Sequence, residues 1–373
     1  MAGIYIHIPF CRKRCSYCDF HFSTTFSNYR GELIAAINLE LALRSKELKE
    51  PVETIYFGGG TPSLLTEIEL NSILDIIHQS FQFKEQVEIT LEVNPEDVTL
   101  ESTSFWKKSG INRISIGLQS FKDSDLKWMN RAHNLDQGFQ AVELLKKEGF
   151  KNISVDLIYG LPDLTLIEWR RHLEQVIALN VQHISAYCLT VEKRTALNHF
   201  VRIGKLKPPN DDAQSEQFSL MLRFLKENSF FQYEISNFSK RDFESKHNTS
   251  YWQNKQYLGV GPSAHSFDGK TRRWNVSNNT NYYKNVGKNE SWFEQEILTK
   301  NEQWNELLLT GLRTIWGVSK SKLREVGSLS DLERKNIESL KENGDLLETD
   351  ESYVLTEKGL LKADGIAADL FRI

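Results

Sequence analysis

Six short segments rich in β-branched and aromatic residues recur through the first half of the chain, and stretches with helical spacing of apolar residues separate them. Each segment has the pattern of a buried strand. Alternating strands and helices favour a parallel sheet with right-handed crossovers, built either as a doubly wound sheet or as a partial (β/α) barrel. The six segments are Ile4–Ile8, Thr54–Phe57, Val87–Val93, Arg113–Gly117, Ile153–Tyr159 and Gln182–Tyr187.

The ends of these predicted strands carry polar or glycine-rich signals. Gly58–Gly60 follows the second strand, Glu92 ends the third, Gln119 follows the fourth and Asp156 lies inside the fifth. Each has an ordinary explanation, because glycine turns are common in β-α units and a buried carboxylate is usually satisfied structurally. In a barrel, however, such residues converge at the mouth. The convergence therefore favours a partial (β/α)6 barrel over a doubly wound sheet.

The alternation of strands and helices ends after the sixth predicted strand. A helix is predicted over Asp211–Glu227 and a strand over Phe231–Ile235, and the residues from there to about Trp292 are predicted to be irregular. Helices return from Glu294, with a β-hairpin over 344–358 whose turn is expected at 350–352, which indicates a small winged-helix-like domain. We therefore expect a partial barrel over 1–205, an irregular extension over 206–292 and a C-terminal helical domain over 293–373.

Composition excludes several classes of protein. Lys and Arg total 46 against 50 Asp and Glu, a net charge of −4, and no basic cluster indicates a nucleic-acid partner. The longest apolar stretches, Leu33–Leu43 and Ile153–Leu161, are interrupted by polar residues and are too short to span a membrane. The first residues have the pattern of a strand and not of a signal peptide, so we expect a cytoplasmic protein.

Three cysteines, Cys11, Cys15 and Cys18, fall within one loop directly after the first strand, and Cys188 stands far downstream. A structural zinc site needs four ligands, for which His7 is the available fourth candidate. An iron–sulfur cubane held by three thiolates would keep one iron open to another ligand. Three reduced core cysteines are disfavoured, because the residues between the first two thiols, 12–14, are all basic.

The C-x3-C-x2-C spacing resembles that of the radical S-adenosylmethionine (SAM) superfamily. The resemblance implies a 4Fe–4S cluster whose open iron is chelated by the amino and carboxylate groups of SAM. Over nearly the whole chain, YIHIPFC, FGGGTPS, LEVNP, ISIGLQSF, NRAH and VDLIYGLP are similar to the oxygen-independent coproporphyrinogen III oxidase branch. By this resemblance the triad Cys11, Cys15 and Cys18 holds the cluster, and the SAM site is lined by Tyr5, Tyr17, Gly59, Gly60, Thr61, Glu92, Gln119, Arg131, Asp156 and Thr190.

The chain departs from the oxidases near the triad. Phe20 stands where the oxidases carry a further cysteine, and only ten residues precede Cys11, where the oxidases have a longer segment. Because phenylalanine can act neither as a ligand nor as a redox partner, we expect the decarboxylation chemistry to be absent.

A second motif lies at 247–252, with the sequence HNTSYW. Histidine and tyrosine both serve as axial haem ligands, although a histidine among aromatic residues is more often packed in a core. The H-N-x-x-Y-W string resembles the haem-binding motif of the HemW family of haem chaperones, which implies that His247 and Tyr251 bind haem. His265 is a second candidate, expected to have a supporting or structural role. Cys188 and the histidines at 78, 172, 183 and 199 show no ligand spacing and are interpreted as structural.

The resemblance implies that the chain is a haem chaperone that holds a 4Fe–4S cluster, SAM and haem. Its expected partners are haem, a haem-acceptor protein of the membrane-associated respiratory class and an electron donor for the cluster. The alternative is a coproporphyrinogen III oxidase that converts propionate side chains to vinyl groups, so the enzymatic character stays open. A cluster protein without haem is disfavoured by the complete SAM pocket.

Overall fold

The computed structural model describes residues 2–373. Six parallel strands lie side by side in chain order at the centre of a twelve-stranded sheet. A doubly wound sheet would reverse its strand order part-way, whereas sequential order belongs to a singly wound, barrel-like sheet. The partial barrel predicted from the sequence is confirmed. Its strands are β1 (Ala2–Ile8), β2 (Val52–Gly59), β3 (Phe83–Val93), β4 (Arg113–Gln119), β5 (Ile153–Tyr159) and β6 (His183–Cys188).

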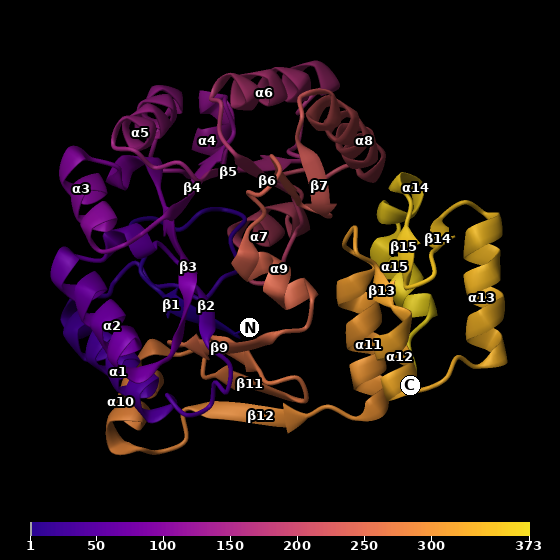
Figure 1. The fold of residues 1–373 in the computed structure, drawn as a ribbon. Coiled ribbons are helices and arrows are strands. Elements are labelled where there is room, and N and C mark those ends of the chain that lie inside the picture. The colour runs from indigo at the N-terminus through magenta and orange to yellow at the C-terminus, as the bar shows by residue number, and fades with distance from the viewer. Residues whose placement is uncertain (1) are drawn as a thin grey trace.

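Helices form an arc around the outside of this curved sheet (Figure 1). Several begin with a capping box, in which the side chains of the first and fourth residues bond to each other's backbone N–H, as in the pair Thr66 and Glu69. Their apolar faces join one core with the strands, in which Ile4, Ile6 and Ile8 of β1 are fully buried. The helices are α1 (Arg30–Leu43), α2 (Glu67–Ser80), α3 (Leu100–Lys108), α4 (Asp123–Trp128), α5 (Leu135–Lys147) and α6 (Leu166–Ala178).

The segment after β6 begins with α7 (Ala196–Arg202) and α8 (Asp211–Glu227). The hairpin of β7 (Phe231–Glu234) and β8 (Asn237–Ser239) then adds antiparallel strands to β6, and α9 (Lys246–Trp252) follows. On the opposite edge, β9 (Gln256–Val260) pairs in parallel with β1. The strands β10 (His265–Phe267), β11 (Thr271–Asn275) and β12 (Phe293–Ile297) continue antiparallel, with α10 (Asn279–Lys288) between the last two.

The prediction that the residues up to about Trp292 are irregular is therefore wrong. Its polar residues suggested a loop, but Asn275, Tyr282 and Trp292 all donate hydrogen bonds to the buried carboxylate of Glu40 on α1, at 2.5–3.1 Å. A polar residue that serves a buried network has no signature in the local sequence pattern, which predicts structure only from periodic burial of apolar groups.

The C-terminal residues form a separate cluster of helices with a three-stranded sheet, visible at the right of Figure 1. Its own core includes Trp304, Leu308, Ile337 and Leu370. The predicted hairpin is present, although the residues between its strands are 349–351, one position earlier than expected. The elements are α11 (Lys300–Gly311), β13 (Val318–Ser319), α12 (Lys320–Val326), α13 (Asp331–Glu342), β14 (Leu346–Glu348), β15 (Ser352–Leu355), α14 (Glu357–Leu360) and α15 (Ala363–Asp369).

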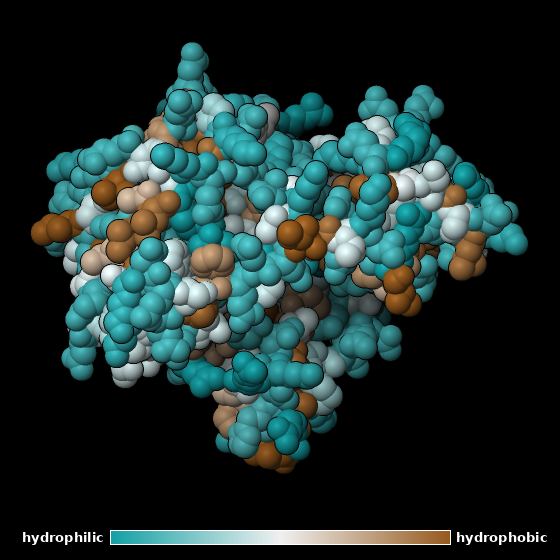
Figure 2. All heavy atoms as spheres, turned by 90° about the horizontal axis from the view of Figure 1, so that it is seen from below, coloured by the Kyte–Doolittle hydropathy of each residue, from teal (hydrophilic) through white to brown (hydrophobic). Residues whose placement is uncertain are grey.

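Between residues 2 and 373, no helix has the length and apolar character needed to cross a membrane. The face of the molecule seen from below is mostly hydrophilic, with hydrophobic residues gathered in small groups (Figure 2).

Candidate functional site

The cysteine loop leaves β1 and is closed at its base. The backbone N–H of Cys11 donates to the carbonyl of Ser23, and the N–H of Ser23 donates to the carbonyl of Pro9, at 3.0 and 2.8 Å. Phe10 is fully buried below the loop and stacks on Phe26. These contacts hold both ends of the loop on the barrel before any ligand is present.

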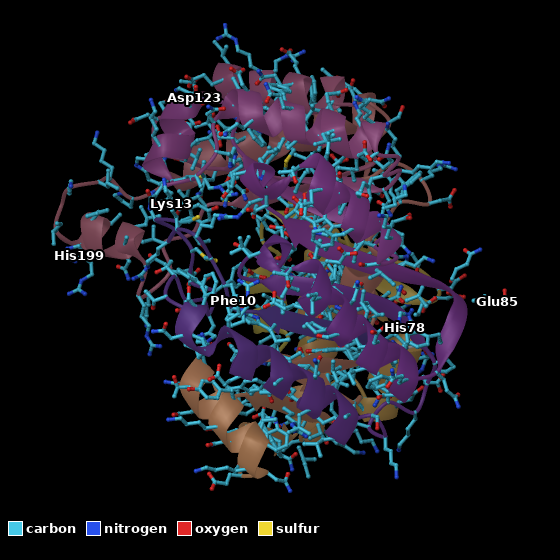
Figure 3. All side chains as sticks on the ribbon, turned by 90° about the vertical axis from the view of Figure 1, so that its left-hand side faces the viewer. Phe10, Lys13, His78, Glu85, Asp123 and His199 are labelled. Atoms are coloured by element: carbon cyan, nitrogen blue, oxygen red, sulfur yellow. The ribbon has the colours of Figure 1, made fainter. Side chains whose placement is uncertain are left out.

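The tip of the loop is held by the loops after other strands. Arg12 forms an ion pair with Asp97 at 2.8 Å, and Ser16 bonds through its backbone to Met129 and to Leu197 at the start of α7. In Figure 3, Lys13 lies beside the segment that carries His199, on the far side of the barrel from His78 and Glu85. The triad is therefore positioned at the carboxyl ends of the strands, where barrel proteins build their sites.

Polar side chains contact the thiols. The hydroxyl of Thr61 donates to Cys11 Sγ at 3.4 Å, and Arg131 Nη1 donates to Cys15 Sγ at 3.6 Å. Burial raises the pKa of Cys11 to about 11 and that of Cys18 to about 12. Deprotonated thiolates at these positions therefore need a metal or a neighbouring cation to offset the loss of water.

The glycine motif after β2 is required by packing inside the protein. A Cβ atom on Gly60 would lie 2.7 Å from the carbonyl oxygens of Ile8 and Phe10, and one on Gly59 would lie 2.4 Å from the ring of His7. Gly59 also has φ of +101°, in the left-handed region that favours glycine. The expectation from sequence was that these glycines admit a ligand, and the structure adds that they admit the cysteine loop itself.

Two carboxylates lie at the mouth of the barrel. Burial raises the pKa of Glu92 to about 7, although the hydroxyl of Tyr56 donates to it at 2.8 Å. Burial likewise raises the pKa of Asp156 to about 6, and Ser115 donates to this carboxylate at 3.1 Å. Serine hydroxyls thus satisfy Asp156, in line with the ordinary structural explanation for such a carboxylate.

Arg131 reaches the site from the connection between α4 and α5. Its Nη2 atom donates to Asn94 Oδ1 at 2.7 Å and to the carbonyl of Gly117 at 2.9 Å, while its Nε atom is buried without a hydrogen-bond partner. The backbone of Gln119 has φ of +65°, and the pairing of β4 with β5 is irregular just before it. Such an irregularity next to a site redirects a side chain out of the strand pattern.

These residues enclose one cavity of about 410 Å³. It brings together the triad and most of the residues expected in the SAM site, namely Cys11, Cys15, Cys18, Tyr17, Gly59, Gly60, Thr61, Glu92, Gln119, Arg131, Asp156 and Thr190. Tyr5 is the exception and lines a neighbouring cavity. Between residues 2 and 373, no three His, Cys, Asp or Glu side chains group closely enough to hold a single metal ion.

The cavity also contains residues that the sequence analysis missed. Asn94, Ser115 and Tyr187 lie in its wall. Asn94 could have been found, because it stands two residues beyond Glu92 at a strand end. Cys188, interpreted from the sequence as structural, ends β6 and lines the same cavity. Its distance from the triad in sequence concealed this, because β6 and β1 belong to one barrel.

Two family models match this chain. Residues 5–176 match the radical SAM superfamily, and residues 298–361 match the HemN C-terminal domain. A HemW haem chaperone of Bacillus subtilis is 34% identical over 366 residues, covering 97% of each chain. Another from Lactococcus lactis is 35% identical and covers 85% of this chain and 83% of its own. This chain belongs to the HemW haem chaperone family.

The solved structure of the coproporphyrinogen III oxidase HemN from Escherichia coli has the same fold as this HemW family member. Its TM-score is 0.84 at 22% sequence identity, and the match covers 99% of this chain and 90% of the oxidase chain. The radical SAM superfamily to which HemW proteins belong implies a 4Fe–4S cluster and SAM. The residues present fit both groups, because three thiols share one cavity with the unpaired Nε of Arg131 and with two partly buried carboxylates.

The motif at 247–252 lies on α9, with His247 and Tyr251 on one face. His247 is buried, however, and both ring nitrogens are engaged. Its Nδ1 lies 2.7 Å from Thr54 Oγ1 and its Nε2 lies 2.7 Å from the hydroxyl of Tyr251. Burial lowers the pKa of His247 to about 3. In this arrangement His247 has no nitrogen to offer to iron.

Tyr251 nevertheless lines a second cavity, of about 480 Å³, next to the first. His7, the fourth zinc ligand considered from the sequence, also faces this second cavity, with its nitrogens bonded to the Tyr5 hydroxyl and the His21 carbonyl at 3.2 and 2.8 Å. The two cavities meet at Asp19 and Phe20, which line both.

Proposed function

We propose that this protein is a haem chaperone, which holds a 4Fe–4S cluster and SAM in the cavity at the barrel mouth, binds haem beside it and transfers the haem to an acceptor protein. The acceptor we propose is a membrane-associated respiratory enzyme, and a separate electron donor reduces the cluster. Family membership and the convergence of the triad with the polar mouth residues support this proposal.

The chain's own residues provide the binding functions. Cys11, Cys15 and Cys18 would hold the cluster, whose remaining iron supplies an open coordination site. Arg131 beside Cys15 offsets the negative charge of the thiolates. Thr61 donates to Cys11, and Asn94 holds Arg131 in place. The polar ends of Glu92 and Asp156 supply hydrogen-bond acceptors at the mouth.

The observation that carries the proposal is the environment of Phe20. This side chain is 66% exposed, and it stands where the two cavities meet. Because Phe20 lines both cavities, a ligand bound in either of them would cover its ring. A flat aromatic face is suited to a macrocycle and cannot act in the redox chemistry that a thiol would support.

The test is a parallel assay after anaerobic reconstitution of the full chain. Haem is titrated and followed by its Soret band, and the loaded protein is mixed with membrane vesicles that contain haem-free respiratory enzyme. A second sample receives coproporphyrinogen III, SAM and a reductant, and porphyrins are separated by chromatography. We expect saturable haem binding, transfer to the vesicles and unconverted coproporphyrinogen. Stoichiometric formation of protoporphyrinogen would instead establish the oxidase.

A further inference from the structure

The second cavity contains several candidate iron ligands, and their hydrogen bonds distinguish them. Its wall is built from the inner face of β1, the end of the cysteine loop and the segment around β9 and β10. The side chains that line it are Tyr5, His7, Asp19, Phe20, His21, Tyr251, Tyr257, Ser263 and His265. Its volume of about 480 Å³ falls within the range of cofactor pockets.

Most of the donors in this wall are already engaged. Both nitrogens of His7 are bonded, and the hydroxyl of Tyr251 is bonded to His247. His21 Nε2 lies 2.6 Å from Asn279 Oδ1, which leaves only Nδ1 of that ring, the nitrogen nearer the backbone, open to a ligand. The ring of His265 is exposed, and neither of its nitrogens hydrogen-bonds to any residue in 2–373. Imidazole is the commonest proximal ligand of haem iron.

The backbone that carries His265 is held rigidly. A Cβ atom on Gly259 would lie 1.9 Å from the carbonyl oxygen of His265, so only glycine lets β9 and β10 approach this closely. Ser266 accepts a hydrogen bond from the Gly259 N–H at 2.9 Å, and the buried Arg44 donates to Ser266 at 3.0 Å. A ligand placed on such a fixed strand is presented in one position, which metal sites require.

The ring itself is also oriented. It stacks on Trp274 of the paired strand β11, with centroids 6.4 Å apart and planes at 29°. Other aromatic side chains supply flat surfaces around the same space: Tyr5, Tyr257 and, at the junction with the cluster cavity, Phe20.

We infer that His265 is the axial ligand of haem in this cavity, that Phe20 contacts the macrocycle, and that His247 is a positioning residue that acts on the cavity through Tyr251. The inference rests on the proposed haem-binding function and assigns its site. Haem held in this cavity would lie beside the cluster cavity, and Phe20 lines both.

The test uses ferric haem titrated into the reconstituted full chain, with the Soret band, electron paramagnetic resonance and thermal unfolding as readouts. His265→Ala should remove the histidine-ligated signature and weaken haem binding more than about a hundredfold. This exceeds the loss expected when a residue that only hydrogen-bonds to a metal ligand is removed. Free imidazole should restore the signature. His21→Ala should keep the signature, and its loss in this variant would assign the ligand to His21. The control outside the cavity is His199→Ala, at an exposed position on α7, which should change neither binding nor spectrum.

His247→Gln should lower the unfolding temperature and weaken haem binding by about tenfold while keeping the histidine-ligated spectrum. This is the effect expected of a residue that positions the site without touching the iron. If His265→Ala and His265→Gln both fold and bind haem with the wild-type spectrum, the assignment is wrong and the proposed function stands. If His247→Gln loses the signature instead, the ligand is His247. If wild-type protein binds no haem at all, the proposed function itself fails.

Discussion

The Nε2 atom of His247 lies 2.7 Å from the hydroxyl oxygen of Tyr251, one helical turn further along α9. The other nitrogen of the same ring is bonded to Thr54 on β2, so the imidazole connects α9 to the barrel sheet. The ring also stacks on Tyr56 at 5.0 Å. The motif has residue types that often bind metals, but here its histidine connects two segments almost 200 residues apart in sequence.

The burial of His247 predicts acid sensitivity. The folded protein keeps this ring neutral down to pH about 3, whereas the unfolded chain takes up a proton near 6.5. Between these values the unfolded state binds more protons, so the contribution to stability is complete above pH 6.5 and is lost as the pH falls towards 3. Urea unfolding at pH 7, 5.5 and 4 should show the stability difference between wild type and His247→Gln shrinking at low pH.

The loss should amount to a few kcal/mol at most, because one pKa unit corresponds to about 1.4 kcal/mol. His199→Gln, at an exposed position on α7, is the control and should leave the profile unchanged. A constant difference between wild type and His247→Gln at all three pH values would show that the ring is not held neutral by the fold.

Each cysteine of the triad should be indispensable for the cluster. Changing any one of Cys11, Cys15 and Cys18 to alanine should reduce iron after anaerobic reconstitution from about four atoms per chain to near zero, since a cubane needs its thiolates. The effect of SAM on the resonance of the reduced cluster should vanish with it.

Cys188→Ala is the matched control for the triad, because this thiol lines the same cavity from β6. We expect full iron content in this variant. Equal iron in wild type and in the triple cysteine variant would overturn the cluster assignment, and so would uptake of zinc alone by wild type.

The carboxylate of Glu40 should be critical for stability. It is fully buried, pairs with Arg44 at 2.8 Å and accepts from the backbone N–H of Gly261 at 3.0 Å. Removing its charge leaves the buried Arg44 with only the partly exposed Glu47 as a counter-ion, so Glu40→Gln should cost about 1–3 kcal/mol in urea unfolding. Glu143→Gln, which breaks an exposed pair with Lys146, should cost less than about 1 kcal/mol. Similar losses in both variants would contradict this reasoning.

Gly60 should tolerate no side chain. In Gly60→Ala the new methyl group would meet two backbone carbonyls at 2.7 Å, so we expect a loss of about 1–3 kcal/mol and a displaced cysteine loop with less iron bound. Gly31 on α1 has open space around it, and Gly31→Ala should stabilise the protein by about 0.5–1 kcal/mol. Thermal unfolding and iron content measure both effects, and full iron with unchanged stability in Gly60→Ala would refute the packing argument.

The barrel and the triad could be predicted because their signals are local. The six central strands lie where the apolar runs place them, and Ile153–Tyr159 has the predicted bounds. Parallel strands in chain order bring their carboxyl ends together by topology alone. The convergence of Glu92, Gln119 and Asp156 on the cysteine loop therefore follows from the order of the segments.

The region after residue 235 was not predictable in the same way. The strand β9 pairs with β1, more than 250 positions earlier in the chain, and Asn275 is buried against a glutamate of the first helix. Neither contact leaves a periodic signal, because a polar residue looks the same in sequence whether water or a buried partner satisfies it.

The sequence by itself determined the class of the protein, the shared loop of the three cysteines and the end of the barrel at which the polar residues meet, since these depend on spacing and element order. Only the tertiary structure decided which histidine can offer a nitrogen. His247 and His265 are both histidines among aromatic residues in the sequence, but Thr54 and Tyr251 occupy the nitrogens of the first, whereas the second faces a cavity. The state of a side chain's hydrogen bonds depends on partners supplied by distant segments, and those partners are known only once the chain has folded.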